Sequence, residues 1–354
     1  MIKNHYSILI AGILSASIAM SANAETEWAI KIFDGVDLVD INNSGQIVGR
    51  YTGTNQHFIT GTDGEGIIKT FDLSGGWVSA INDSGQITGI GGGTGAFITD
   101  ANGENLRSIG TLGGKDSTAF DINNSGQVVG TSSTPEGDFH AFMTGSNGVG
   151  MIDLGTLGGK YSYASAINES GQVVGLSETA DGSFHAFMTG SNGNGMTDLG
   201  ALDARGSIAT SINDHGQVVG VLSYSGYEES FITGPNGEDM DYLGSSRAIE
   251  INNSGQVILN FYGPAISAWL YSGDGSFINL GLLPIFSTVG GVSELSADAI
   301  NDKGQIIGRF HDRKGSFMLT PVSPVPEPQN YAMLLAGLGL MAFRRNRLFK
   351  LTNY

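Results

Sequence analysis

The sequence predicts an all-β repeat protein, and it favours a seven-bladed β-propeller of four-stranded blades followed by a short C-terminal hydrophobic helix. Two observations carry this prediction. A nine-residue motif occurs seven times at spacings of 39 to 49 residues, and apolar, strand-like segments recur around it with the same period. Repeats of this length with four short strands each are typical of propeller blades. An open solenoid or a pair of β-sandwiches is the alternative architecture.

The repeated motif reads Ile-Asn-x-x-Gly-Gln followed by a β-branched residue. Asn favours the first position of a type I turn, and Gly three residues later accepts a positive φ, so the motif predicts a hairpin corner. The predicted turn residues are Asn42 and Gly45, Asn82 and Gly85, Asn123 and Gly126, Asn168 and Gly171, Asn213 and Gly216, Asn252 and Gly255, and Asn301 and Gly304.

Two further segments accompany every copy of the motif. A Phe-centred strand follows it, clearest as AFMTG from Ala141, and a segment typified by DLGTLGG from Asp153 precedes it. Runs such as Gln127-Val128-Val129 place apolar side chains on both faces of a strand, so both faces need cover. Counting from the DLG strand gives seven whole units over residues 25–320. The sequence therefore predicts closure by packing of blade faces, with no blade shared between the termini.

The stretch from Asp121 also resembles the start of a calcium loop, D-x-N-x-S-G. An Asp precedes the motif only at Asp40 and Asp121, with Glu250 in a third copy and Ala or Ser in the others. The twelfth position, which needs a bidentate acid, is Ser132 here. We therefore predict no metal site and no cofactor, and we interpret the Asp as incidental; a weak, partial cation site is the alternative.

An Asn-x-Ser glycosylation signal overlaps the same motif. It is present in five copies and absent at Asn213 and Asn301, where His215 and Lys303 replace the Ser. What persists is Asn, Gly and Gln, which favours a structural turn over a modification site.

No catalytic residue is predicted. The chain has no motif of a serine hydrolase, zinc protease or phosphate-binding loop. We assign His57, His140 and His185 to one repeated position beside the Phe strand, where packing explains them. Paired carboxylates at a propeller mouth would suit glycoside cleavage, but 34 acidic residues single out no pair.

Aromatic residues that interrupt the repeat are the better indication of a binding surface. They occur in predicted loops, where such rings stack on sugars or pack between blades: Trp77, Tyr161, Tyr163, Tyr224, Tyr227 and Tyr262.

Composition excludes several function classes. The chain has no Cys, so it forms no disulfide and no thiolate site. Its net charge of −17 makes nucleic acid an unlikely partner, because phosphate binding needs the opposite sign.

The N-terminal end has the features of a secretory signal peptide. Residues 1–24 combine Lys3, an apolar run and an A-x-A cleavage site at Ala22 and Ala24.

The other end contains a three-part segment. A Pro-rich linker over residues 321–330 includes Val325, Pro326, Glu327 and Pro328, and an apolar run covers residues 331–343. The basic tail, 344–354, begins with Arg344, Arg345 and Arg347. Thirteen apolar residues are short for a stable membrane span.

Two parts of the chain resemble known families. The C-terminal segment is similar to the PEP-CTERM sorting tail of Gram-negative bacteria. That resemblance implies an exosortase-type partner, transient membrane insertion and removal of the tail near residues 326–328. The extension 348–354 after the arginines departs from such tails. The repeat units resemble the extracellular HAF repeat, through His140-Ala141-Phe142 and His185-Ala186-Phe187 together with DLGTLGG.

The family resemblances and the composition together predict an exported, non-enzymatic protein of the cell surface or extracellular matrix. We expect it to bind exopolysaccharide or another envelope component through its loops. The alternative is a propeller enzyme, a glycoside hydrolase or lyase that acts on extracellular glycans.

Overall fold

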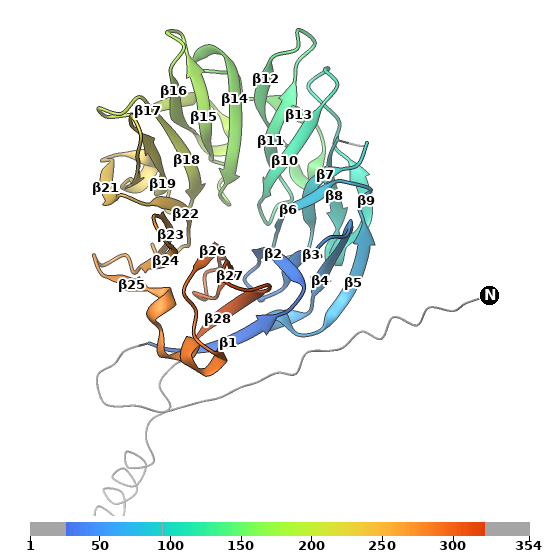
Figure 1. The fold of residues 1–354 in the computed structure, drawn as a ribbon. Coiled ribbons are helices and arrows are strands. Elements are labelled where there is room, and N and C mark those ends of the chain that lie inside the picture. Colours follow the sequence, from blue (N-terminus) through green and yellow to red (C-terminus); the bar gives the residue numbers. More distant parts are fainter. Residues whose placement is uncertain (1–25, 94, 323–354) are drawn as a thin grey trace, which may run out of the picture.

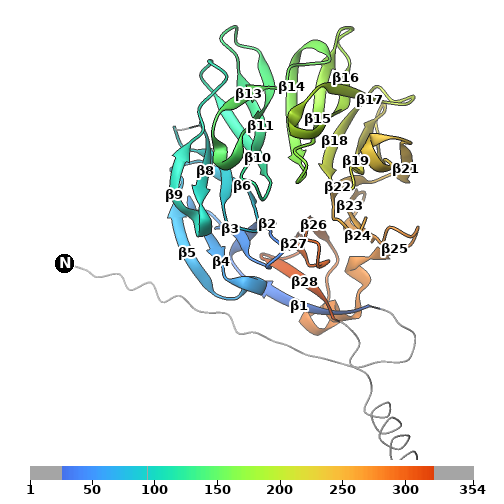
Figure 2. The ribbon, with the colours of Figure 1, turned by 180° about the vertical axis from the view of Figure 1, so that it is seen from behind.

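The computed structural model describes residues 26–93 and 95–322. They form seven four-stranded antiparallel sheets arranged in a ring (Figure 1; seen from behind in Figure 2). A channel lined by the first strands of all seven sheets lies at the centre of the ring. The predicted all-β, seven-bladed propeller is therefore confirmed. The signal peptide with Ala22 and Ala24, the sorting residues from Val325 to Arg347 and the predicted C-terminal helix lie outside the described residues. Within the described ranges, no helix has the length and apolarity needed to cross a membrane.

Each blade has an inner strand beside the channel, then a second, a third and an outer strand. The inner strands are β2 (Val36–Ile41), β6 (Trp77–Ile81), β10 (Ser117–Ile122), β14 (Gly158–Ile167), β18 (Gly206–Ile212), β22 (Arg247–Ile251) and β26 (Leu295–Ile300). The second strands are β3 (Ile47–Tyr51), β7 (Ile87–Gly91), β11 (Val128–Ser133), β15 (Val173–Thr179), β19 (Val218–Ser223), β23 (Val257–Tyr262) and β27 (Ile306–Phe310).

The third and outer strands complete the blades. The third strands are β4 (Gln56–Thr60), β8 (Gly95–Asp100), β12 (Phe139–Thr144), β16 (Phe184–Thr189), β20 (Glu228–Ile232), β24 (Ile266–Tyr271) and β28 (Ser316–Val322). The outer strands are β5 (Ile67–Asp72), β9 (Glu104–Ser108), β13 (Met151–Asp153), β17 (Met196–Gly200), β21 (Asp241–Gly244), β25 (Phe277–Asn279) and β1 (Glu27–Phe33). Short 3₁₀ turns are η1 (Thr62–Gly64), η2 (Ala101–Gly103), η3 (Ser146–Gly148), η4 (Ser191–Gly193), η5 (Pro235–Gly237), η6 (Leu280–Leu282) and η7 (Pro284–Val289).

The ring closes through a blade that both ends of the described chain build, contrary to our prediction. Each DLG strand is the outer strand of the preceding blade, not the first strand of its own. The earliest copy of this strand, β1, therefore has no preceding blade, and it pairs with β28 from Glu27↔Val322 to Phe33↔Ser316. Figure 1 shows the blue β1 beside the red β28. Backbone hydrogen bonds, and not blade packing alone, close the ring.

The repeated Phe and a Gly on the neighbouring strand form the core of a blade. Phe58 on the third strand pairs with Gly49 on the second, and a Cβ on Gly49 would lie 2.6 Å from the Phe58 ring. The ring is 1% exposed, and burying a side chain of this size stabilises the fold by about 1.5–3 kcal/mol. In the sixth blade Leu259 and Trp269 replace this Gly–Phe pair. In the other six copies a Cβ on this Gly would lie within 2.6 Å of a backbone carbonyl of the inner strand, and at Gly49, Gly220 and Gly308 it would also meet the Phe ring. Close approach of these groups to bare backbone thus explains the repeated Gly.

Candidate functional site: the channel and its two faces

The strand directions give the propeller two different faces. Every inner strand ends at its Asn-x-x-Gly-Gln turn, so these seven turns surround one mouth of the channel; we call this the turn face. The loops between second and third strands and the connections between blades lie at the opposite end, which we call the loop face.

The repeated Asn links neighbouring blades as well as forming a turn. In each copy its Oδ1 accepts a hydrogen bond from the Gln backbone N–H. Its Nδ2 donates to the Gln Oε1 at 2.7–3.0 Å. It also donates to the backbone carbonyl of the corresponding Asn in the next blade at 2.9–3.1 Å. The last link runs from Asn301 back to Asn42. Seven buried amides therefore form a closed hydrogen-bonded ring around the channel.

The turn glycines adopt the backbone that the motif predicts. All seven have a φ between 71° and 76°. A Cβ at Gly126 would also lie 2.8 Å from the backbone nitrogen of Asn147 in η3. Both the positive φ and this close contact therefore exclude a side chain at this position.

The residue after the Asn forms a second closed ring, which sequence reasoning missed. Its backbone N–H donates to the side-chain oxygen of the equivalent residue in the next blade at 2.8–2.9 Å. The ring consists of Asn43, Asp83, Asn124, Glu169, Asp214, Asn253 and Asp302. The signal was available, because all seven copies have an amide or a carboxylate here although the residue type changes. Any of these side chains supplies the required acceptor.

The acid before the motif also joins blades and is not incidental. Asp40 accepts from its neighbour Ile41 and, at 2.8 Å, from the N–H of Ile81 in the next blade. Asp121 accepts from Ile167 at 2.9 Å in the same way. Glu250 accepts from Ile300 at 2.7 Å. These three carboxylates bind the edge of the following inner strand, so our interpretation of them was wrong.

Burial in the channel makes these carboxyl groups hard to ionise. It raises the pKa of Asp40 to about 7, with smaller contributions from the negative charges of Asp121 and Asp83. Burial likewise raises the pKa of Asp121, and it raises that of Glu250 well above its ordinary value, with the negative charge of Asp40 adding to the effect. The channel carboxyls therefore hold protons more tightly than free carboxyl groups.

The channel itself has a volume of about 330 Å³. Each inner strand carries a β-bulge just before the motif, at Val39 in the first blade, so two successive residues can line the channel. Eight acids line it: Asp40, Asp83, Asp121, Glu169, Asp214, Glu250, Asp298 and Asp302. Among the described residues, no group of three or more His, Asp or Glu side chains is arranged to hold a metal ion.

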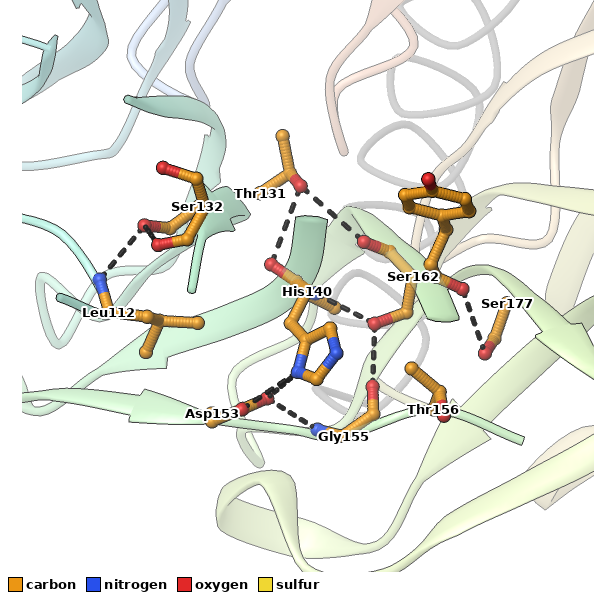
Figure 3. A network of polar contacts seen from close by, with 12 residues as sticks. Leu112, Thr131, Ser132, His140, Asp153, Gly155, Thr156, Ser162 and Ser177 are labelled. Atoms are coloured by element: carbon orange, nitrogen blue, oxygen red, sulfur yellow. Dashed lines mark hydrogen bonds and ion pairs between the residues drawn. The ribbon is translucent and has the colours of Figure 1, made fainter. Parts of the chain in front are cut away.

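The histidines of the HAF motif pair with the aspartates of the DLG motif. His140 Nδ1 lies 2.8 Å from Asp153 Oδ2 (Figure 3). In the next blade His185 Nδ1 lies 2.9 Å from Asp198 Oδ2. A His–Asp pair suggests a hydrolase, but the nearby Ser162 hydroxyl is bound to the Ala141 N–H and the Gly155 carbonyl. The repeated network binds the DLG loop to the adjacent blade.

His57 does not share the position of those two histidines, which corrects our assignment. The strand register pairs Arg50 with His57, whereas Thr131 pairs with Ala141 and Ser132 with His140. His57 thus occupies a position that is Ala or Ser in the other six blades: Ala96, Ala141, Ala186, Ser230, Ala268 and Ser316. It is 2% exposed, and burial lowers its pKa.

The structure brings the six predicted aromatic residues to the loop face. Trp77 begins an inner strand, and Tyr262 ends a second strand. Tyr161 and Tyr163 are the fourth and sixth residues of β14, and Tyr224 and Tyr227 are the first and last residues of the loop between β19 and β20. Trp77, Tyr227 and Tyr262 are 46%, 55% and 62% exposed. Tyr224 stacks on Tyr227 with 4.7 Å between ring centroids.

A small cavity of about 180 Å³ lies on the same face. We call it the arginine pocket, because its polar lining is Asp37, Arg50, His57, Trp77 and Arg309. Arg50 Nε lies 2.9 Å from Asp37 Oδ2. Arg309 binds both oxygens of Asp298 at 2.9 Å each. Val39 lines both the pocket and the channel, so the two adjoin.

Comparison with solved structures identifies the fold. YCF48 from Cyanidioschyzon merolae aligns with a TM-score of 0.52 and 12% identity, over 82% of this chain and 98% of that chain. An oligogalacturonate lyase in complex with manganese aligns with a TM-score of 0.51 and 12% identity, over 87% and 96%. TolB from Acinetobacter baumannii aligns with a TM-score of 0.46 and 15% identity, over 66% of this chain and 61% of that chain.

These likenesses are to the fold alone, since all identities are low. No protein-family model matches the chain, and no curated protein sequence matches it significantly. The chain is thus a seven-bladed propeller whose structural neighbours include both lyases and other proteins.

Proposed function

We propose that the chain is an exported surface or matrix protein that binds exopolysaccharide or another envelope component through the loop face of its propeller. The observation that carries this proposal is the placement of the six aromatic residues. They come from four blades between residues 77 and 262, yet all lie on one face. Exposed rings beside a few polar groups are the usual elements of a small-molecule site.

The sorting signals at the two ends of the sequence support export. The signal-peptide features of residues 1–24 and the PEP-CTERM-like segment from Val325 to Arg347 agree with a chain that crosses the inner membrane and meets an exosortase-type enzyme. The HAF-like repeats agree with an extracellular location. On mature surface protein, mass spectrometry would find a C-terminus near Pro328; peptides from residues 348–354 would contradict processing.

The binding test is affinity electrophoresis of the purified chain in gels that contain the producing bacterium's own exopolysaccharide. The polymer should retard the wild-type chain more than Trp77→Thr, a variant that carries the Thr found at the equivalent position of the next blade. That difference would support the loop face as the binding surface. Equal mobility with and without polymer, together with no retention on envelope fractions, would overturn the proposal.

An enzyme is the second candidate, because buried carboxyls with raised pKa values suit general-acid catalysis. Asp40 and Glu250 are such groups in the channel. Each also accepts a backbone hydrogen bond from the next blade, which gives it a structural role. Glycan turnover that Glu250→Gln abolishes in a folded protein would favour the enzyme.

A further inference from the structure

We propose that the arginine pocket binds the carboxylate of an acidic sugar, with Trp77 covering one face of the sugar ring. The inference deepens the proposed function and rests on it for the ligand class. It starts from the places where the sequence departs from its own repeat, because residues that only build a blade recur in every blade.

Four side chains that differ from the equivalent residues of most other blades line the arginine pocket. Arg50 and Arg309 occupy the same position in adjacent blades, and the other five blades have Ile90, Thr131, Leu176, Val221 and Asn260 there. His57 replaces Ala or Ser, as described above, and Trp77 replaces the Asp37 of the preceding blade. The propeller therefore does not need these side chains in order to fold.

The pocket contains hydrogen-bonding groups that the described part of the chain does not use. His57 Nδ1–H donates to the Asn55 carbonyl, so its buried Nε2 is an acceptor, and it has no partner among the described residues. Arg50 uses only Nε, and Arg309 uses Nε and Nη2. A buried acceptor without a partner is unfavourable, so a cavity beside such a group is suited to a ligand that carries hydroxyl groups.

The charges favour a monoanion with planar geometry. Guanidinium N–H groups match a carboxylate in two parallel hydrogen bonds. Asp37 and Asp298 already offset the two arginines, so the pocket is close to neutral and tolerates one added negative charge better than the two of a phosphate monoester. Trp77, 46% exposed at the rim, offers an apolar surface for the ring carbons.

The cavity size limits what enters. Sites for drug-sized ligands have about 300–1,000 Å³, and this pocket has about 180 Å³. It accommodates one acidic sugar unit, and a polymer would continue across the loop face.

The test compares three probes that share one ring: sodium glucuronate, glucose and glucose 6-phosphate. Saturation-transfer NMR and calorimetric titration on the mature chain are expected to show glucuronate binding, with glucose and the phosphate at least tenfold weaker. Binding of none of the three, as for a pocket that holds only water, would overturn the inference, and so would a preference for the phosphate.

The variants use residues that other blades already carry, so each is expected to fold. Arg50→Ile should weaken glucuronate binding roughly tenfold or more, the value of a hydrogen bond to a charged group. His57→Ala should weaken it less, because the neutral imidazole, whose Nδ1–H donates to the Asn55 carbonyl, only accepts at Nε2 from a sugar hydroxyl. His215→Ser and Lys303→Ser, on the turn face, are matched controls and should leave binding unchanged. Equal binding by wild type and Arg50→Ile, with circular dichroism showing both folded, would contradict the assignment.

A parallel experiment separates this inference from the proposed function. Exopolysaccharide is compared with the same polymer after chemical reduction of its carboxyl groups. Retention that ignores both the reduction and Arg50→Ile preserves the proposed function and overturns the carboxylate pocket. Glucuronate binding without retention of any polymer preserves the carboxylate pocket and overturns the proposed function.

Discussion

The repeated Asn has two roles at the scale of a single residue, and only one was predictable. The spacing to Gly predicted the turn, because turn chemistry is local. The donation from Nδ2 to the next blade was not predictable, since it depends on which strands meet across a distance of about 40 residues. Asp forms such turns as well as Asn does, yet no copy has Asp at this position. The inter-blade donor gives the physical reason.

Substitutions at Asn123 separate the two roles. Asn123→Asp keeps the turn acceptor but places an oxygen against Gln127 Oε1 and the Asn168 carbonyl, which accept from Nδ2 at 2.8 and 3.1 Å. We expect the free energy of unfolding to fall by about 2–4 kcal/mol, as for Asn123→Ala, because buried partners lose their hydrogen bonds. Urea denaturation measures it. The exposed Asn194→Ala serves as control, and wild-type stability in Asn123→Asp would show that the donor is unimportant.

At the scale of the strand, the sequence predicted the number and length of elements better than their grouping. Four strands recur with one period, so any of them can be taken as the first of a unit. The pattern alone cannot choose among these frames. The faint KIFDG segment at Lys31 was the only sign that β1 belongs to the set of outer strands, and it lacks the full DLG signature. Its partner is almost 290 residues away, beyond the reach of local pattern.

A designed cross-link tests closure through β1. Ala29 lies opposite Thr320 in the β1–β28 pair, and the chain has no native Cys. Ala29→Cys with Thr320→Cys should form a disulfide under oxidation and raise the free energy of unfolding by about 2–4 kcal/mol.

The matched control for the cross-link is Ala29→Cys with Val322→Cys, two residues out of register and about 7–8 Å apart on the diagonal. Non-reducing electrophoresis reports both products. If the two pairs cross-link equally, the β1–β28 register is wrong.

At the scale of the whole molecule, the channel makes stability depend on pH. Asp40, Asp121 and Glu250 have raised pKa values in the folded state, so the folded chain binds more protons than the unfolded chain between about pH 4 and pH 7. The stability that these three groups contribute is therefore fully present below their unfolded pKa, and it is lost as pH rises through their folded values. For Asp40 the loss is at most about 4 kcal/mol, at about 1.4 kcal/mol per pKa unit.

Thermal unfolding at pH 5, 6, 7 and 8 measures this effect. Glu250→Gln keeps an acceptor for the Ile300 N–H but cannot ionise, so we expect a smaller loss of Tm between pH 5 and pH 8. The exposed Glu136→Gln should behave as wild type. A Tm that rises over this range, in either wild type or variant, would refute the assignment of buried protonated carboxyls.

The molecule as a whole thus has two faces that differ in their residues. The turn face contains the repeated residues, whose hydrogen bonds hold the blades in a ring. The loop face contains the aromatic residues and the arginine pocket, which depart from the repeat. The sequence indicated the aromatic candidates individually, but only the arrangement of strands shows that they share a face with Arg50, His57 and Arg309.

The most direct test of this division is exopolysaccharide retention by matched variants of the two faces. The loop-face double variant is Trp77→Thr with Tyr262→Ser, and the turn-face double variant is His215→Ser with Lys303→Ser. Retention is measured by affinity electrophoresis, after thermal unfolding has shown that both double variants are as stable as the wild type. We predict that the loop-face double variant loses retention and that the turn-face double variant keeps it. Retention that survives the loop-face changes and disappears with the turn-face changes would contradict the account.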